Sequence, residues 1–329
     1  MGARTSENQG GKPGVRVPKV GPGAPELSTR NSGPYTIRGM SPLPIAVIGR
    51  SGMLSRALQH VSGGNVIAWP SSRVDVRTEK QVREALASDR PGVVINCAAF
   101  TDVDAAETRQ EEAYAVNQAG AANVAGACAA AGVRLVHVST DYVFDGMKDR
   151  PYVESDAARA LGVYGDSKLK GEGEVSARCA NHVIARTAWL YGPWSRRNFV
   201  DTMVKLTAER PAVDVVADAW GSPTYSIDLA RALLFLAASD VRGVVHAVNA
   251  GRTTWHGLAS RIVELSGRRC EVRPVGQAAF PRPARRPSNS ALDAGLLAAA
   301  GHVMRAWEEA LAEYLREFGT KPQSAQVPQ

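Results

Sequence analysis

The feature that most constrains the fold is a regular alternation of short apolar runs with amphipathic stretches, which begins at Pro44. The apolar runs of the first half are residues 45–48, 66–69, 92–96, 134–138 and 183–185. The segments with helical periodicity between them include residues 54–61, 78–87 and 111–131. Continuously apolar strands separated by helices are typical of a parallel sheet that is covered on both faces. The pattern predicts a doubly wound α/β fold of the Rossmann type, with ligands at the carboxyl ends of the strands.

The alternation becomes less regular after about residue 190. The helical segments expected there are residues 198–209, 228–239 and 305–318, and the expected strands are residues 213–216 and 244–248. We assign residues 44–190 to a dinucleotide-binding domain. Residues 191–319 are assigned mainly to a smaller C-terminal substrate-binding lobe, with some strands returning to the main sheet.

The two ends of the chain have a different composition. Residues 1–43 are rich in Gly, Pro and Ser and lack the apolar stretch of a secretion signal. That composition cannot supply a core, so we predict disordered tails at residues 1–43 and 320–329. No apolar run approaches the roughly 20 residues needed to span a bilayer. We therefore expect a cytoplasmic protein without a membrane partner.

Composition excludes several classes of site. The four cysteines lie far apart without a Cys-x-x-Cys pair, which argues against a disulfide framework and a zinc site. The net charge of +7 suits either nucleic acid or an anionic small molecule. Because no helix-turn-helix, zinc finger or aromatic-basic interleaving is visible, we expect no nucleic-acid partner. The acidic residues of segment 102–107 are more typical of a helix start than of a metal site.

A glycine-containing segment, residues 49–54 (GRSGML), links the first predicted strand to the first predicted helix. Gly49 and Gly52 let backbone N–H groups approach a pyrophosphate at the helix N-terminus. Because turns use glycine routinely, the position after the first strand is what makes the segment a cofactor-binding candidate. Ser55 stands where the third glycine of the usual spacing would be, and it is small enough for close packing of helix on strand.

The residues after the second predicted strand bear on the choice of cofactor. An NAD site often carries an acid there for the ribose hydroxyls. This sequence has Ser71, Ser72 and Arg73 instead, and no acid before Asp75. Two hydroxyls and a guanidinium suit a 2′-phosphate better, which favours NADPH. An ordinary polar turn, with NADH serving as well, stays open.

The strongest local signal is the pair formed by Tyr164 and Lys168. Residues i and i+4 share one face of a helix, so the phenol and the ammonium should point into one site. A free Tyr has a pKa of about 10, and a neighbouring cation favours the phenolate. The pair follows residues 138–146 (VSTDYVFDG), where a buried strand ends in hydroxyls. We predict that Tyr164 donates a proton with the help of Lys168 and Thr140.

Together these segments resemble the dTDP-4-dehydrorhamnose reductase family, a branch of the extended short-chain dehydrogenases/reductases. The matching motifs are 96–107 (NCAAFTDVDAAE), 139–146 (STDYVFDG), 163–172 (VYGDSKLKGE), 186–192 (RTAWLYG), 198–199 (NF), 221–224 (GSPT) and 284–290 (ARRPSNS). The resemblance implies NAD(P)H-dependent reduction of the C4 ketone of a dTDP-4-dehydro-6-deoxy sugar, in dTDP-L-rhamnose or deoxysugar biosynthesis.

The resemblance also implies a role for each matching residue. The cofactor would meet Gly52, Met53 and Leu54 at its pyrophosphate, Asp75 and Val76 at its adenine, and Ala98, Ala99 and Phe100 near its middle. Tyr164 would protonate the developing alkoxide, while Lys168 would bind the nicotinamide ribose and lower the pKa of Tyr164. Thr140 would hydrogen-bond the substrate carbonyl, Asp141 would hold the sugar, and Trp189 would pack against it.

Other functions share some of these features. A non-catalytic NADP-binding regulatory subunit of this fold can keep the Tyr–Lys pair, and a sugar-nucleotide epimerase or dehydratase uses it. The presence of Thr140 and Trp189 beside that pair favours an enzyme, and the RTAW and ARRPSNS segments favour the reductase branch. Some family members bind magnesium at a dimer interface. We find no such carboxylates here and predict no metal, and a homodimer remains compatible with the resemblance.

Overall fold

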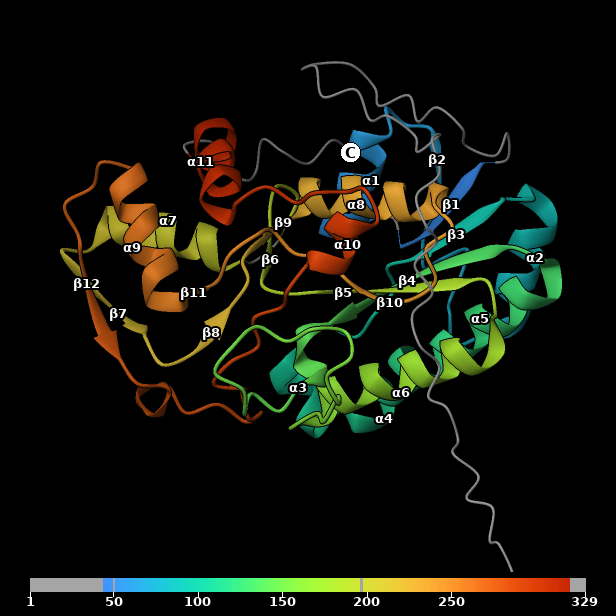
Figure 1. The fold of residues 1–329 in the computed structure, drawn as a ribbon, viewed down its shortest axis with the longest axis horizontal. Helices are drawn as coiled ribbons and strands as arrows, with labels where there is room; N and C mark the ends of the chain where they lie inside the picture. The colour runs from blue at the N-terminus through green and yellow to red at the C-terminus, as the bar shows by residue number, and fades with distance from the viewer. Residues whose placement is uncertain (1–43, 50, 196–197, 320–329) are drawn as a thin grey trace, which may run out of the picture.

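The computed structural model describes residues 44–49, 51–195 and 198–319, so the tails predicted at 1–43 and 320–329 lie outside the described residues. Its centre is a six-stranded sheet in the order β10-β5-β4-β3-β1-β2, and every neighbouring pair is parallel (Figure 1). The strands are β1 (Ile45–Ile48), β2 (Val66–Trp69), β3 (Val93–Asn96), β4 (Arg134–Thr140), β5 (His182–Thr187) and β10 (Gly243–His246). The predicted doubly wound α/β fold is confirmed.

The strand order reverses once, between β1 and β3. From β1 the chain moves outward to β2, and it then crosses back to place β3 on the other side of β1. In an open parallel sheet, ligands bind in the crevice at the carboxyl ends of the strands where the order reverses. The topology therefore predicts a ligand-binding site at the segments that follow β1 and β3.

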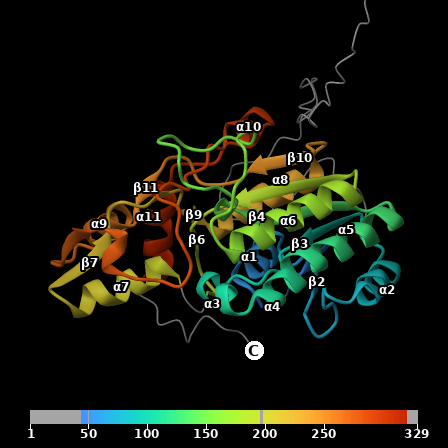
Figure 2. The same ribbon diagram turned by 90° about the horizontal axis from the view of Figure 1, so that it is seen from below.

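Helices cover both faces of the sheet (Figures 1 and 2). One face carries α1 (Met53–Val61) and α8 (Ser226–Ala238), and the other carries α2 (Glu79–Asp89), α5 (Gly120–Ala131) and α6 (Val163–Arg178). Successive strand residues point to opposite faces. Val136 accordingly packs in the same cluster as Leu58 of α1, whereas Leu135 packs with Val82 of α2 and Val124 of α5. Both faces are apolar, which explains the continuous apolar runs of the sequence.

The second half of the chain builds a smaller body beside the sheet, on the left of Figure 1. It contains β7 (Ala212–Val216) paired in parallel with β12 (Glu271–Val275), together with α7 (Phe199–Glu209) and α9 (Trp255–Leu265). The short strands β6 (Leu190–Tyr191), β8 (Trp220–Gly221), β9 (Thr224–Tyr225) and β11 (Thr253–Thr254) and the helix α11 (Trp307–Phe318) complete it. The short helix α10 (Gly295–Ala299) lies instead against β10 of the main sheet. The division of the chain at residue 190 stays a prediction, and β10 shows that one strand from beyond it joins the main sheet.

One predicted helix is interrupted. The segment expected as a single helix over 111–131 consists of α4 (Gln110–Tyr114), a π-helical turn (Ala115–Ala119) and α5, preceded by the short α3 (Val103–Thr108). Gly132 ends it in the left-handed conformation, with φ of +67°, as the glycine predicts. A single π turn inside a helix commonly accompanies a functional site. Across the described residues, no helix is both long and apolar enough to cross a bilayer.

Candidate active site

A cavity of about 570 Å³ lies at the carboxyl ends of β1, β3, β4 and β5, where the sheet topology predicts a ligand-binding site. It brings together nine of the residues predicted from the sequence, namely Gly52, Met53, Leu54, Ala99, Thr140, Asp141, Tyr164, Lys168 and Trp189. The same cavity is lined by Cys97, Thr101, Tyr142 and Trp255, to which the sequence had given no role. These four residues follow or face the predicted segments, so only their three-dimensional placement identifies them.

Gly49 and Gly52 lie at the two ends of the segment that joins β1 to α1. Gly49 has φ of +100°, a conformation that side-chain-bearing residues rarely adopt. Gly52 is the N-cap of α1, and as a glycine it has no side chain to cap the helix. Its first N–H groups therefore face the cavity with the positive end of the helix dipole. Ser55 is buried, and its Oγ lies 3.1 Å from the position of a Cβ on Gly49. The helix and the turn are therefore so close at this point that residue 55 must be small.

Three of the other predicted cofactor residues lie away from the cavity lining. Arg73 Nη2 donates to Asp89 at 2.7 Å, and this hydrogen bond raises the pKa of Arg73. Asp75 accepts from Arg77 Nε at 2.9 Å, which lowers the pKa of Asp75. Val76 is buried against α5, where a Cβ on Gly120 would come within 2.6 Å of its Cγ2. Their proposed contacts with the adenosine stay predictions.

The loop after β3, which carries Ala98 and Phe100, is fixed by Asn117 in the π turn. The Phe100 N–H donates to Asn117 Oδ1 at 2.9 Å. Asn117 Nδ2 donates to the Phe100 carbonyl at 3.1 Å and to Ser167 Oγ at 3.0 Å. Asn117 thus ties the cofactor-side loop to α6. The sequence analysis missed this residue, although an Asn in an otherwise Ala-rich segment was the available signal.

Helix α6 carries Tyr164 and Lys168 one turn apart and lies very close to its neighbours. A Cβ on Gly165 would lie 2.1 Å from the Tyr142 carbonyl oxygen, and one on Gly171 would lie 2.1 Å from that of Asn117. Burial raises the pKa of Tyr164 to about 12, against the lowering effect of its hydrogen bond with Thr140. The phenol is therefore protonated at neutral pH and can act as a proton donor.

Lys168 is almost wholly buried, and its Nζ donates to the carbonyl oxygen of Val138 at 2.7 Å. Burial lowers its pKa to about 8, while the charge of Glu172 raises it. Desolvation of the phenol is the main cause of the raised pKa of Tyr164, and the role of Lys168 in lowering that pKa stays a prediction. Glu172 is itself fixed by Arg186 of β5, whose Nε and Nη2 donate to its two oxygens at 2.9 and 2.6 Å.

Asp141 is buried and directly follows Thr140, the last residue of β4. It accepts a hydrogen bond from Thr140 Oγ1 at 2.9 Å. Burial raises its pKa to about 6, although hydrogen bonds from Ser290 and Thr140 lower it. A carboxyl group that titrates near neutrality inside a cavity is a candidate functional group.

Trp189 separates this cavity from a second one of about 630 Å³. Trp189 has φ of +44°, a strained value for a bulky residue. Residues of α7, β7 and the loop after β12 line the second cavity, including Phe199, Arg210, Phe280, Arg282 and Arg286. The ARRPSNS motif (residues 284–290) and the loop before it thus form one wall of a cavity lined by aromatic and basic residues. Within the described part of the chain, no group of three or more His, Cys, Asp or Glu side chains is arranged to hold a metal ion.

The chain is similar to known proteins along nearly all of its described length. The family model of the RmlD substrate binding domain matches residues 43–320. A dTDP-4-dehydrorhamnose reductase of Mycobacterium tuberculosis H37Rv is 47% identical over 261 residues, which cover 77% of this chain and 85% of that protein. A crystal structure of a dTDP-4-dehydrorhamnose reductase from Clostridium acetobutylicum superimposes with a TM-score of 0.80 and 37% identity, covering 84% of this chain and 99% of that one.

A second solved structure is the dTDP-4-dehydrorhamnose reductase of Bacillus anthracis in complex with NADP. It has a TM-score of 0.80 and 35% identity, and the match covers 84% of this chain and 99% of that chain. These matches agree with the motifs that line the cavity. The chain belongs to the dTDP-4-dehydrorhamnose reductase family.

Proposed function

We propose that this protein is an NADPH-dependent reductase that converts the C4 ketone of a dTDP-4-dehydro-6-deoxy sugar into an alcohol. The observation that carries the proposal is the convergence of Thr140, Tyr164 and Lys168 on one cavity at the carboxyl ends of the strands. A reductase needs a proton donor for the developing alkoxide, and a hydroxyl pair held beside a buried ammonium supplies one. The activity of the relatives agrees with this assignment.

The residues around the cavity fit a dinucleotide. Gly49 and Gly52 leave room for a pyrophosphate at the N-terminus of α1, and the first turn of that helix carries no acidic residue to repel it. Ala99 follows β3 and lines the same cavity, and it would border the middle of the dinucleotide. When bound, NADPH supplies the hydride that reduces the ketone.

Thr140 and Tyr164 would bind the ketone oxygen. Both residues line the cavity, where Asp141 accepts a hydrogen bond from Thr140 Oγ1. As negative charge develops on the oxygen, Tyr164 transfers its phenolic proton to it, and the product is a neutral alcohol. The transfer is favourable because an alkoxide is a much stronger base than a phenolate.

Lys168 and Asp141 would complete the site. Lys168 stabilises the phenolate that Tyr164 becomes after the transfer, and it donates toward the nicotinamide ribose. Asp141 would accept hydrogen bonds from sugar hydroxyls when it is ionised. Trp189, which lines the cavity, would pack against the sugar.

The nucleotide part of the substrate would lie in the second cavity. Its arginines, Arg210, Arg282 and Arg286, suit a diphosphate, and its aromatic residues, Phe199 and Phe280, suit a thymine ring. The two cavities adjoin at Trp189, so one dTDP-sugar could extend through both. The basic net charge of the chain is consistent with an anionic substrate.

The deciding experiment is incubation of the purified protein with dTDP-4-dehydro-L-rhamnose and NADPH. We expect NADPH to be oxidised in proportion to sugar consumed, and NMR of the product should show a new C4 carbinol proton. UDP-glucose is the control and should cause no NADPH oxidation. Absence of turnover with every dTDP-4-dehydro sugar tested would instead favour a regulatory subunit. We also propose that the protein acts in the cytoplasm, where a reductase of this family would meet its cofactor.

A further inference from the structure

We propose that Asp104 is a positioning residue that holds Arg282 and Arg286 at the substrate cavity, so that α3 links the cofactor side of the enzyme to the diphosphate of the substrate. The inference rests on the proposed function. It assigns a role to the acidic segment 102–107, whose sequence indicated only the start of a helix.

Asp104 makes contacts far along the chain. Its Oδ2 accepts from Arg286 Nη2 at 2.9 Å and lies 3.6 Å from Arg282 Nη1. Its Oδ1 accepts from the backbone N–H of Ala284 at 3.2 Å. One carboxylate therefore holds both the guanidinium groups and the backbone of the Pro-Arg loop. The prolines of this loop have no backbone N–H to donate, so the loop backbone is held through other residues, such as Ala284.

The remaining acids of segment 102–107 hold α3 in place. Asp102 caps the helix, with its Oδ1 accepting from the Ala105 N–H at 3.0 Å. Glu107 Oε1 accepts from the Val163 N–H, the first residue of α6, at 2.8 Å. The helix is thus fixed to the element that carries Tyr164, and Asp104 projects from it toward the arginines.

The ion pair of Asp104 with Arg286 bears on substrate binding because of where Arg286 lies. Arg286 lines the second cavity, and its guanidinium lies 5.8 Å from the ring centroid of Tyr142, a residue that lines both cavities. Tyr142 in turn contacts Tyr164 edge to face, with 5.7 Å between ring centroids. Arg286 therefore stands at the junction of the cavities, where a diphosphate would join the sugar. Held from one side by Asp104, it can present its other N–H groups to a phosphate oxygen.

Asp104 remains charged at any pH at which the enzyme would be assayed. Its hydrogen bonds from Ala284 and Arg286 and the charges of Arg286 and Arg282 outweigh the effect of burial and lower its pKa. Among the described residues, Asp104 is the carboxylate that pairs with Arg286, so substitution of Asp104 removes its anchoring acid.

The test is Asp104→Asn, assayed with dTDP-4-dehydro-L-rhamnose and NADPH. We expect the KM of the sugar nucleotide to rise roughly tenfold, the factor for one lost charge-assisted contact, with kcat and the KM of NADPH within about twofold of the parent. Asp104→Glu should recover most of the loss, since it restores a carboxylate. In an Arg286→Gln background, Asp104→Asn should add less than twofold, because both changes remove the same contact.

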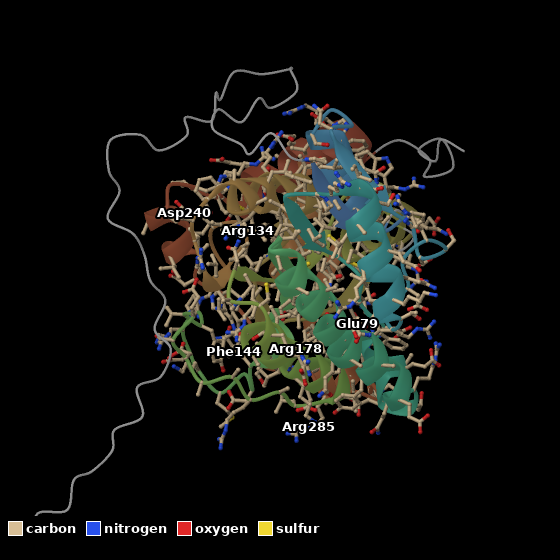
Figure 3. All side chains as sticks on the ribbon, turned by 90° about the vertical axis from the view of Figure 1, so that its right-hand side faces the viewer. Glu79, Arg134, Phe144, Arg178, Asp240 and Arg285 are labelled. Atoms are coloured by element: carbon tan, nitrogen blue, oxygen red, sulfur yellow. The ribbon has the colours of Figure 1, made fainter. Side chains whose placement is uncertain are left out.

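Two control variants separate positioning from general effects. Glu112→Gln neutralises an exposed carboxylate of α4 that pairs with Arg109, and it should leave both KM values unchanged. Arg285→Gln removes the neighbouring exposed arginine, which is labelled near the lower edge of Figure 3. It should change the KM of the sugar nucleotide much less than Arg286→Gln does. An unchanged or lowered sugar-nucleotide KM in Asp104→Asn would overturn the proposal.

The proposal and the proposed function fail in different ways. If the parent protein oxidises no NADPH with the sugar, the proposed function fails. The dissociation constant of dTDP, measured by calorimetry on parent and Asp104→Asn, then still tests the positioning role. If the parent is active and dTDP binds both proteins equally, only the role of Asp104 is refuted.

Discussion

The indole rings of Trp189 and Trp255 stack face to face, with their centroids 3.4 Å apart and an angle of 5° between their planes. Both residues line both cavities, so the pair forms the wall between them. Gly221 lies behind Trp189, where a Cβ would come within 2.1 Å of the indole. The wall is therefore fixed in position from two sides.

Gly221→Ala should displace Trp189 and damage substrate binding. Overpacking of this kind costs about 1–3 kcal/mol of stability, and we expect a rise of at least severalfold in the KM of the sugar nucleotide. Chemical denaturation and steady-state kinetics check the two effects. Gly173→Ala is the matched control, because an added Cβ there meets nothing within 4 Å. Parent-like values in Gly221→Ala would show that the stack adjusts freely.

Tyr164→Phe should lower kcat by roughly 10²–10⁴, the usual contribution of a positioned general acid. The dissociation constant of NADPH should stay close to that of the parent, because the phenol oxygen is the only group removed. Tyr152→Phe, which removes a hydroxyl bonded to Asp145, is the control and should retain turnover. Turnover of Tyr164→Phe within a few-fold of the parent would exclude Tyr164 as the proton donor.

Lys168→Met should abolish most activity and weaken NADPH binding, yet leave the protein at least as stable at neutral pH. Burial lowers the pKa of Lys168 from 10.5 to about 8, so the folded state disfavours the ammonium. Between pH 8 and 10.5 the unfolded chain binds a proton that the folded protein has lost, so this group makes the free energy of unfolding rise with pH. Melting temperatures across that range should rise less steeply in Lys168→Met. The same slope in both proteins contradicts the assignment.

The pH dependence of kcat/KM should be bell-shaped. Activity should rise with an apparent pKa of about 6 as Asp141 ionises and fall with one of about 8 as Lys168 loses its proton. Asp141→Asn should lower activity and flatten the acid limb while the alkaline limb persists. Rate profiles of parent and variant over pH 5–10 decide this, and an unchanged acid limb in the variant would assign that limb to another group.

Arg73→Ala should raise the KM of NADPH and leave that of NADH nearly unchanged. Arg73 follows β2, and its side chain is 40% exposed even though it pairs with Asp89, so it has donors left for a 2′-phosphate. Loss of a contact made equally in ground and transition states changes KM rather than kcat. Steady-state kinetics with each cofactor is the measurement. An unchanged NADPH-to-NADH ratio would mean that Arg73 serves only to hold Asp89.

Much of the sheet could be predicted from the sequence because each strand is marked by an apolar run within its own segment. The bounds of β1 and β2 agree with the apolar runs at 45–48 and 66–69 residue for residue. The π turn at Ala115–Ala119 was not predicted, and its residue Asn117 makes hydrogen bonds with Phe100 and Ser167, which are distant in the sequence. An Ala-rich run has the periodicity of an uninterrupted helix whether or not such a contact exists.

The site was predictable to the extent that its residues sit at strand ends or share a helix face. Tyr164, Lys168 and Thr140 satisfy that condition. Trp255 and Arg286 reach the site from elements whose placement depends on the packing of the whole second half, so their residue types alone carry no signal. The hydrogen bond from Lys168 to the Val138 carbonyl could not be predicted either, because the spacing of residues along α6 does not show which backbone group the ammonium meets.

The strand order has a consequence for how the protein is made. β5 ends at Thr187, but its outer neighbour β10 does not begin until Gly243. At roughly 5–20 residues per second, the ribosome needs on the order of several seconds to supply that strand. Until β10 is supplied, the outer edge of β5 has unpaired backbone N–H and C=O groups, which can pair with another chain. The yield of this enzyme in a cell should therefore depend on the speed of translation between these two strands and on the chaperones that shield the edge meanwhile.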